Sequence, residues 1–107
     1  MNNSDCCDIV AKGVDLDGAT VRMSALAHPA RLRILGHLSA SPNCCCKDVV
    51  SATDLAQSTV SQHLKVLVDA GLVNYSADNR HSRYSLNREA VSAMRAEIDT
   101  ILSGCCA

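Results

Sequence analysis

The sequence has no tryptophan, no phenylalanine and only two tyrosines among its 107 residues. Hydrophobic residues still make up 48% of the chain, which excludes a disordered tail and requires an aliphatic core. A chain of this length is expected to form one domain with a modest core. Small aliphatic cores often share their apolar surface with a second subunit, so we also expect an oligomer.

The sequence also lacks a long apolar run, and its first five residues lack the basic and apolar blocks of a signal peptide. We therefore expect a cytoplasmic protein with no membrane partner. Seven cysteines are present. In a cytoplasmic chain they favour metal or redox chemistry over a disulfide framework, because cytosolic thiols are kept reduced.

The net charge is only −1, so neither positive nor negative charge is in large excess. The lack of a net positive charge at first argues against a nucleic-acid partner. The distribution is uneven, however. Residues 1–20 hold four aspartates and one lysine, whereas residues 55–88 hold one lysine, three arginines and two histidines against two aspartates. An acidic beginning and a basic second half are compatible with a local DNA-facing surface.

Hydrophobic periodicity predicts a mainly α fold with a small β-hairpin. Helices are expected over about 16–27, 29–38, 43–53, 58–70 and 88–103, and strands over about 72–76 and 83–86. The order α-α-α-α-β-β-α is that of a winged helix-turn-helix. Residues 1–14 are expected to form a flexible Cys-bearing arm, 15–104 the DNA-binding and dimerisation domain, and 105–107 a Cys-bearing tail.

Local signals set the expected helix ends. Pro29 suits the first turn of the second helix, and Asn43 is expected to cap the third. Thr59 and Gln62 have the spacing of a capping box, which would fix the start of the fourth helix. Gly71 is expected to end that helix.

The fourth helix is the candidate DNA reader. Its apolar stripe turns Val60, Leu64, Leu67 and Val68 inward. The polar residues left on the outer face or at its boundary are Ser58, Thr59, Ser61, Gln62, His63 and Lys65. An ordinary solvated face fits the periodicity equally well. The hairpin that follows favours DNA binding, because a wing carrying Arg80, His81 and Arg83 would reach the flanking backbone.

Three segments resemble the ArsR/SmtB family of metal-responsive repressors: His28–Leu35, Gln57–Leu67 and Ala70–Val73. The resemblance spans about residues 16–102. It implies a homodimeric winged-helix repressor that binds an operator in double-stranded DNA and is released by a metal or metalloid ion. Dimerisation in this family uses the first and last helices, which fits the apolar stripe from Val91 to Leu102.

The cysteines form three clusters of adjacent residues, at 6–7, 44–46 and 105–106. Adjacent thiolates suit soft, thiophilic ions. If Asn43 caps a helix, the middle cluster lies in its first turn, where the helix dipole lowers thiol pKa values. At about 100° per residue, Cys46 would then point into the core and Cys44 away from it. We therefore expect Cys44 and Cys45 to be ligands and Cys46 to be a packing residue.

The resemblance implies a sensor of the arsenical type. Relatives with a cysteine pair on the arm and cysteine at the third helix sense arsenite or soft metals, so Cys6 and Cys7 complete the expected site. The family's Cys-Val-Cys-Asp motif is Cys45-Cys46-Lys47-Asp48 here, with lysine at the second ligand position. The last helix has no histidine, so the family's zinc or nickel site there is absent.

As(III) is the expected inducer, with Sb(III), Cd(II) and Pb(II) as alternatives and no organic cofactor. Cys105 and Cys106 are either a second thiol site or an unspecific tail. A thiol redox sensor of the same fold is the main competing function. A soft-metal buffer would leave the polar face of the fourth helix unexplained. An enzyme is not expected, because no strand-helix-strand unit surrounds a Cys-x-x-Cys motif.

Overall fold

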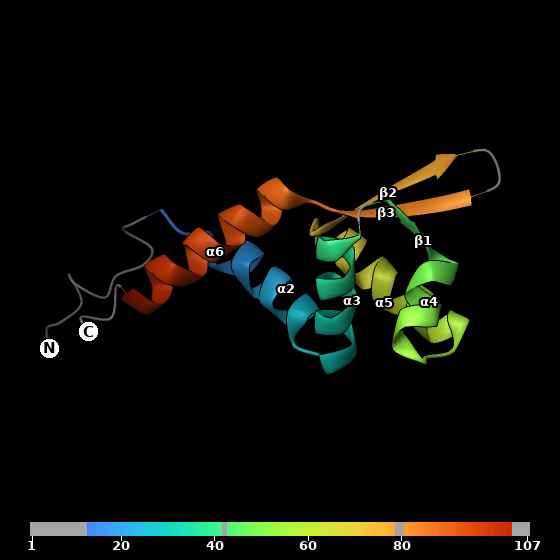
Figure 1. The fold of residues 1–107 in the computed structure, drawn as a ribbon. Helices are drawn as coiled ribbons and strands as arrows, with labels where there is room; N and C mark the ends of the chain where they lie inside the picture. Colours follow the sequence, from blue (N-terminus) through green and yellow to red (C-terminus); the bar gives the residue numbers. More distant parts are fainter. Residues whose placement is uncertain (1–12, 42, 79–80, 104–107) are drawn as a thin grey trace, which may run out of the picture.

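A computed structural model describes residues 13–41, 43–78 and 81–103. The helices are α2 (Leu16–Leu26), α3 (Pro29–Ala40), α4 (Cys46–Thr53), α5 (Gln57–Asp69) and α6 (Arg88–Ser103). The strands are β1 (Cys44–Cys45), β2 (Val73–Asp78) and β3 (His81–Leu86). The chain is a winged helix-turn-helix, so the predicted fold class is confirmed. In Figure 1, α2 lies alongside α6, and the β2–β3 hairpin extends beyond the group formed by α3, α4 and α5.

The sheet has one strand that the sequence did not predict. Its order is β1-β3-β2, with both pairings antiparallel. Strand β1 has only two residues, too few for an alternating pattern to be recognised. Its Cys44 lies opposite Tyr84 and its Cys45 opposite Arg83. The first two cysteines of the middle cluster are therefore joined to the hairpin.

The predicted polar loop at residues 77–82 was too long. Pairing of β2 with β3 continues from Val73–Leu86 to Asp78–His81, so residues 77, 78, 81 and 82 belong to the strands. Three of these four residues have polar side chains, which favoured a loop locally, but an uninterrupted ladder outweighs β-propensity in a hairpin. The hairpin is therefore longer than predicted and projects farther from the helices (Figure 1).

The core is aliphatic, as predicted. Its fully buried side chains come from α3, α4, α5 and the segment before β2: Ile34, Leu38, Val49, Val60, Leu64, Leu67 and Leu72. Helix α6 adds buried Met94, whereas Leu102 near its end is 68% exposed. None of the helices in the described ranges is long and apolar enough to cross a membrane.

Two of the predicted helix caps are wrong. Asn43 does not cap α4, because it has a φ of 58° and turns the chain into β1. Asparagine tolerates this left-handed conformation better than most residues. Helix α4 begins at Cys46, with Cys45 at its N-cap, and the Asp48 carboxylate accepts a hydrogen bond from the Cys45 N–H at 3.1 Å.

The expected capping box at Thr59 is also absent. Helix α5 begins at Gln57 with Ala56 at its N-cap, and no side chain caps it there. Thr59 is therefore already inside the helix. Asp54, in the left-handed region at a φ of 59°, ends α4 and starts the turn that sets this position. The stop at Gly71 is confirmed, since its φ is 82° and its N–H bonds to the Val68 carbonyl at 2.9 Å.

Candidate nucleic-acid interface and cysteine cluster

Helix α5 has one fully buried face and one polar face. Val60, Leu64 and Leu67 have no exposed surface, which fixes the rotation of the helix on the core. The exposed polar residues of the opposite side, together with half-buried Thr59, are Ser58, Ser61, Gln62 and Lys65. Hydroxyl, amide and ammonium groups of this kind can hydrogen-bond base edges and phosphates. The separation of faces predicted from the sequence is therefore confirmed.

Lys65 is paired on its own helix. Its Nζ lies 3.1 Å from Asp69 Oδ2, and the two side chains are 75% and 64% exposed. An ion pair this exposed adds little stability, because water and salt screen it. Lys65 can therefore exchange Asp69 for a phosphate at small cost.

His63 turns away from the exposed face, toward α3. Its Nδ1 accepts a hydrogen bond from Arg31 Nε at 3.2 Å, and its ring lies 4.6 Å from the ring of His28, centroid to centroid. Burial, His28 and Arg31 together lower the pKa of His63. From the sequence, His63 was predicted only to lie at the boundary between the two faces of the helix. Its contact with Arg31 could not be predicted, because the two residues are 32 positions apart.

The hairpin is braced by its aromatic residues. The rings of Tyr75 and Tyr84 lie 5.3 Å apart, and the Tyr75 hydroxyl is 3.2 Å from Ser82 Oγ. His81 is exposed at the far end of β3. Arg83 is half-buried and donates to the Asn43 carbonyl at 3.4 Å, so it is tied to the segment before β1. The predicted wing residue Arg80 lies outside the described residues.

One of the three central cysteines, Cys44, has surroundings different from those predicted. Cys44 is 4% exposed and its thiol donates to the Ser41 carbonyl at 2.8 Å. Burial first, then Asp48 and Cys45, raise the pKa of the Cys44 thiol. The prediction that Cys44 points outward is wrong, because it assumed helical rotation. The backbone is extended through β1, so neighbouring side chains alternate and Cys44 faces the core.

Cys45 and Cys46 are both half-buried. Hydrogen bonds from the Cys45 N–H and thiol lower the pKa of Asp48, and Arg83 and His37 add to this effect. Cys46 packs against the edge of the core, and its Sγ lies 3.6 Å from Ser61 Oγ on α5. Cys44 therefore occupies the fully buried position predicted for Cys46, and Cys46 connects α4 to the polar face of α5.

The residues within the described ranges contain no cluster of three His, Cys, Asp or Glu side chains placed to hold a metal ion. Cys6, Cys7, Cys105 and Cys106 lie outside those ranges. The predicted ligands that the structure describes, Cys44 and Cys45, are neighbours on a single short strand.

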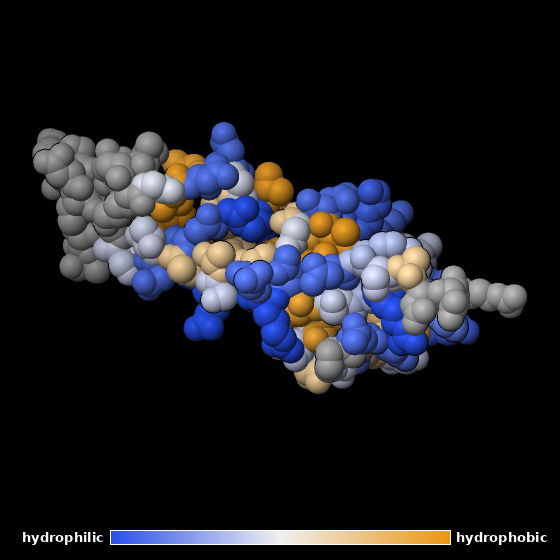
Figure 2. All heavy atoms as spheres, turned by 90° about the horizontal axis from the view of Figure 1, so that it is seen from above, coloured by the Kyte–Doolittle hydropathy of each residue, from blue (hydrophilic) through white to orange (hydrophobic). Residues whose placement is uncertain are grey.

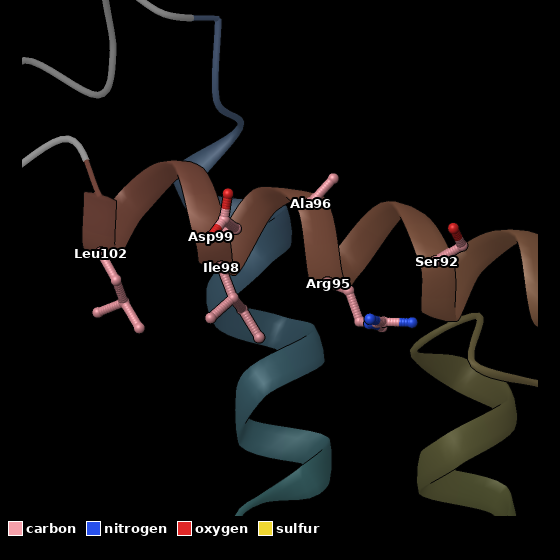
Figure 3. Close-up of a pocket in the computed structure, with 6 residues that line it drawn as sticks. All are labelled: Ser92, Arg95, Ala96, Ile98, Asp99 and Leu102. Carbon is pink, nitrogen blue, oxygen red and sulfur yellow. The ribbon is translucent and has the colours of Figure 1, made fainter.

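A shallow groove follows the outer side of α6. It has a volume of about 630 Å³ and is lined by Ser92, Arg95, Ala96, Ile98, Asp99 and Leu102. Ile98 and Leu102 project from the same side of the helix in Figure 3. Figure 2 shows apolar side chains at this end of the molecule, and Val21 of neighbouring α2 is 57% exposed. The paired helices therefore expose apolar side chains that the core does not cover.

An ion pair joins the same two helices. Arg22 on α2 donates to both carboxylate oxygens of Glu97 on α6, at 2.7 and 2.8 Å. The two side chains are 24% and 23% exposed. Both hydrogen bonds come from a single guanidinium nitrogen, Nη2, and they join α6 to α2.

Comparison with known proteins gives three concordant results. Residues 28–75 match the family described as bacterial regulatory protein, arsR family. The chain is 36% identical over 83 residues to the HTH-type transcriptional regulator YgaV of Escherichia coli K12, covering 78% of this chain and 84% of that protein. It is 34% identical over 76 residues to the arsenical resistance operon repressor of Bacillus subtilis 168, covering 71% of this chain and 72% of that protein.

A solved structure shares the fold as well. It is the solution structure of a homodimeric winged helix-turn-helix DNA-binding domain from Mycobacterium bovis, a possible ArsR-family transcriptional regulator. The TM-score is 0.67 at 28% identity, with 81% of this chain and 80% of that chain covered.

Proposed function

The chain belongs to the arsR family of bacterial regulatory proteins, and we propose that it is a homodimeric repressor that arsenite releases from its operator. The observation that carries DNA binding is the polar face of α5, whose rotation is fixed by Val60, Leu64 and Leu67. This face lies on the helix that a winged helix-turn-helix inserts into the major groove. The adjoining hairpin would contact the flanking phosphates.

The homodimer is supported by the uncovered side of α6. Leu102 is 68% exposed and lies beside Ile98 in the groove, and Val21 on α2 adds further apolar surface. Exposed apolar surface of this kind marks an interaction site. A second copy of the chain fits it, since symmetric dimers read two half-sites of an operator. The Mycobacterium bovis domain with this fold is homodimeric.

The proposed arsenite site joins Cys6 and Cys7 to Cys45. Trivalent arsenic prefers thiolate ligands, and one short strand cannot supply three. Cys45 is the better ligand of the first two central cysteines, because Cys44 is buried and its raised pKa disfavours the thiolate. The sequence predicted both Cys44 and Cys45 as ligands, and of these two we now propose only Cys45 as an arsenite ligand. The arm of the same or the other subunit would provide the remaining thiolates.

Binding at Cys45 would affect DNA contacts through the sheet and α4. Cys45 pairs with Arg83 in the hairpin, and the next residue, Cys46, contacts Ser61 on α5. An ion that ties the arm to this point can favour one arrangement of the two DNA-contacting elements over another. A coupling of roughly 1–3 kcal/mol changes DNA occupancy several-fold or more.

A thiol redox sensor is the second candidate. The observation that favours it is the position of Cys46, a half-buried thiol that contacts Ser61 of α5 and is adjacent in sequence to half-buried Cys45. Oxidation of Cys46 would change its size and polarity at that contact. The two candidates share the DNA-binding surface and differ only in the inducer.

The decisive experiment measures release of the protein from its own promoter DNA. Arsenite, antimonite, cadmium, lead and peroxide are added separately, with a thiol reductant present for the ions. We expect arsenite to release DNA, and the double substitution Cys6→Ser with Cys7→Ser to keep repression and lose the response. The matched control is Cys105→Ser with Cys106→Ser, which should respond normally. Loss of response in that control alone would place the sensor in the tail.

A further inference from the structure

Three side chains meet where the end of α2, the start of α3 and the middle of α5 come together. They are His28, Arg31 and His63, and we call them the His28–Arg31–His63 cluster. His28 is the N-cap of α3, and its Nδ1 accepts a hydrogen bond from the Ala30 N–H at 3.1 Å. His63 lies on α5, between the exposed reading residue Gln62 and buried Leu64.

Arg31 holds the cluster together from its centre. Its Nε donates to His63 Nδ1 at 3.2 Å. Its Nη1 donates to the carbonyls of Ser24 and Ala25 at 3.3 and 3.5 Å, at the end of α2. Because an arginine side chain has only donors, the ring nitrogen of His63 must be an acceptor. One guanidinium therefore joins α2 to α5.

We propose that neutral His63 positions α5 for DNA reading through Arg31, and that protonation of His63 releases this hold and weakens operator binding. The proposal rests on the proposed DNA-binding function. It gives His63 a different role from the direct DNA contact expected from the sequence. His63 acts through Arg31, so it is a positioning residue.

The surroundings of His63 favour its neutral form. A protonated imidazole has two N–H donors and no acceptor, so it cannot receive the Arg31 hydrogen bond. It would also place a second positive charge against the guanidinium. Among the described residues, the charged and titratable groups that face it are Arg31 and His28 on α3. The Asp69 carboxylate of α5 lines a cavity together with Arg31 and is paired with Lys65.

The pKa of His63 supports the same direction, because burial and then His28 and Arg31 lower it. Because the pKa of His63 is lowered in the folded protein, protonation favours states in which the hydrogen bond from Arg31 to His63 is broken. The native contacts are complete above the ordinary histidine pKa of about 6.5. They are lost as the pH falls through the lowered pKa of His63.

The two roles of His63 predict opposite effects of acid. If His63 contacts phosphate directly, its protonation adds a positive charge to the interface and tightens DNA binding. If His63 positions α5 through Arg31, protonation weakens binding. The sign of the pH dependence therefore separates the two roles.

The experiment measures operator affinity of the full-length reduced protein by fluorescence anisotropy between pH 8 and 5.5 at constant ionic strength. His63→Gln keeps an acceptor for Arg31 and cannot be protonated, whereas His63→Leu removes the acceptor. Circular dichroism and sedimentation at each pH confirm fold and assembly.

We expect wild-type affinity to fall by at least about fivefold on acidification, and His63→Gln to stay near the pH 8 wild-type value throughout. His63→Leu should be weakened at every pH. Tighter wild-type binding in acid, lost in His63→Gln, would overturn the proposal in favour of a direct contact. Equal pH profiles for wild type and His63→Gln would also overturn it. Failure of every variant to prefer the operator at pH 8 would instead refute the proposed function.

Discussion

The Sγ atom of Cys46, the first residue of α4, lies 3.6 Å from the Oγ atom of Ser61, on the polar face of α5. The cysteine cluster thus touches the helix proposed to read DNA, without an intervening residue. Cys46 is half-buried at this point, between the core and α5. A change in the size of the Cys46 side chain should therefore shift the DNA-reading face of α5.

The first prediction concerns this contact. Cys46→Val should bind the operator with near wild-type affinity, because the β-branched side chain has a similar size. Cys46→Phe should weaken binding by about tenfold, because overpacking against Ser61 displaces α5 at a cost of about 1–3 kcal/mol. Operator titrations of both variants test this, with thermal unfolding to separate lost folding from lost reading. Equal affinities in two folded variants would show that the contact does not influence α5.

The second prediction concerns base reading. Gln62→Ala removes an exposed amide from the middle of the polar face and should reduce specific operator affinity by about 1–3 kcal/mol while leaving the fold and dimer intact. Asn74→Ala, which removes an exposed amide from β2, is the matched control and should bind normally. Competition between operator and unrelated DNA provides the measurement. Full affinity of Gln62→Ala would remove α5 as the reader.

The third prediction concerns the wing. Arg80, which lies outside the described residues, is expected to contact phosphate, so Arg80→Ala should weaken binding to all sequences alike. The slope of log affinity against log salt should fall by about one. Titrations of operator and random duplex at several salt concentrations check this. A loss confined to the operator would instead indicate base contact.

The fourth prediction concerns the α6 groove. Leu102→Asp should give monomers, because it places a charge on the uncovered apolar surface. The residue is 68% exposed in the single chain, so the fold should be unaffected. Ile98→Asp should have the same effect on assembly with some loss of stability, since Ile98 is half-buried. Sedimentation measures both, and a monomeric wild type at micromolar concentration would contradict the assignment.

The fifth prediction separates two neighbouring cysteines. Cys45→Ser should abolish release by arsenite while keeping DNA binding. Cys44→Ser should respond normally, because the serine hydroxyl can still donate to the Ser41 carbonyl. Arsenite titration of the DNA complexes gives the comparison. Loss of the response in Cys44→Ser alone, with its fold intact, would mean that arsenite binding turns the buried thiol outward.

Sequence alone predicted those features that depend on local periodicity. Of the four predicted inward positions of α5, Val60, Leu64 and Leu67 are fully buried, and half-buried Val68 packs against the core. The start of α3 at Pro29 was predicted from the fixed φ of proline. In these regions neighbouring residues carry the information that sets the structure.

Features set by distant partners were missed. Cys44 was assigned to a helix, but its pairing with Tyr84 forty positions later (44 to 84) makes the backbone extended and buries the thiol. The acceptor role of His63 depends on Arg31, on another helix. Neither relationship leaves a periodic trace in one sequence, because each is created when separate elements pack.

Strand β1 also limits how the cysteine segment and the hairpin can vary. Cys45 is paired with Arg83, and Arg83 reaches back to the Asn43 carbonyl, so the two segments share backbone and side-chain contacts. If the hairpin were replaced by that of another regulator, Cys44 and Cys45 would pair with a strand of different sequence. Chimeras that exchange residues 43–48 together with 73–86 should therefore keep their inducer response better than chimeras that exchange either segment alone. The two segments form a single structural unit.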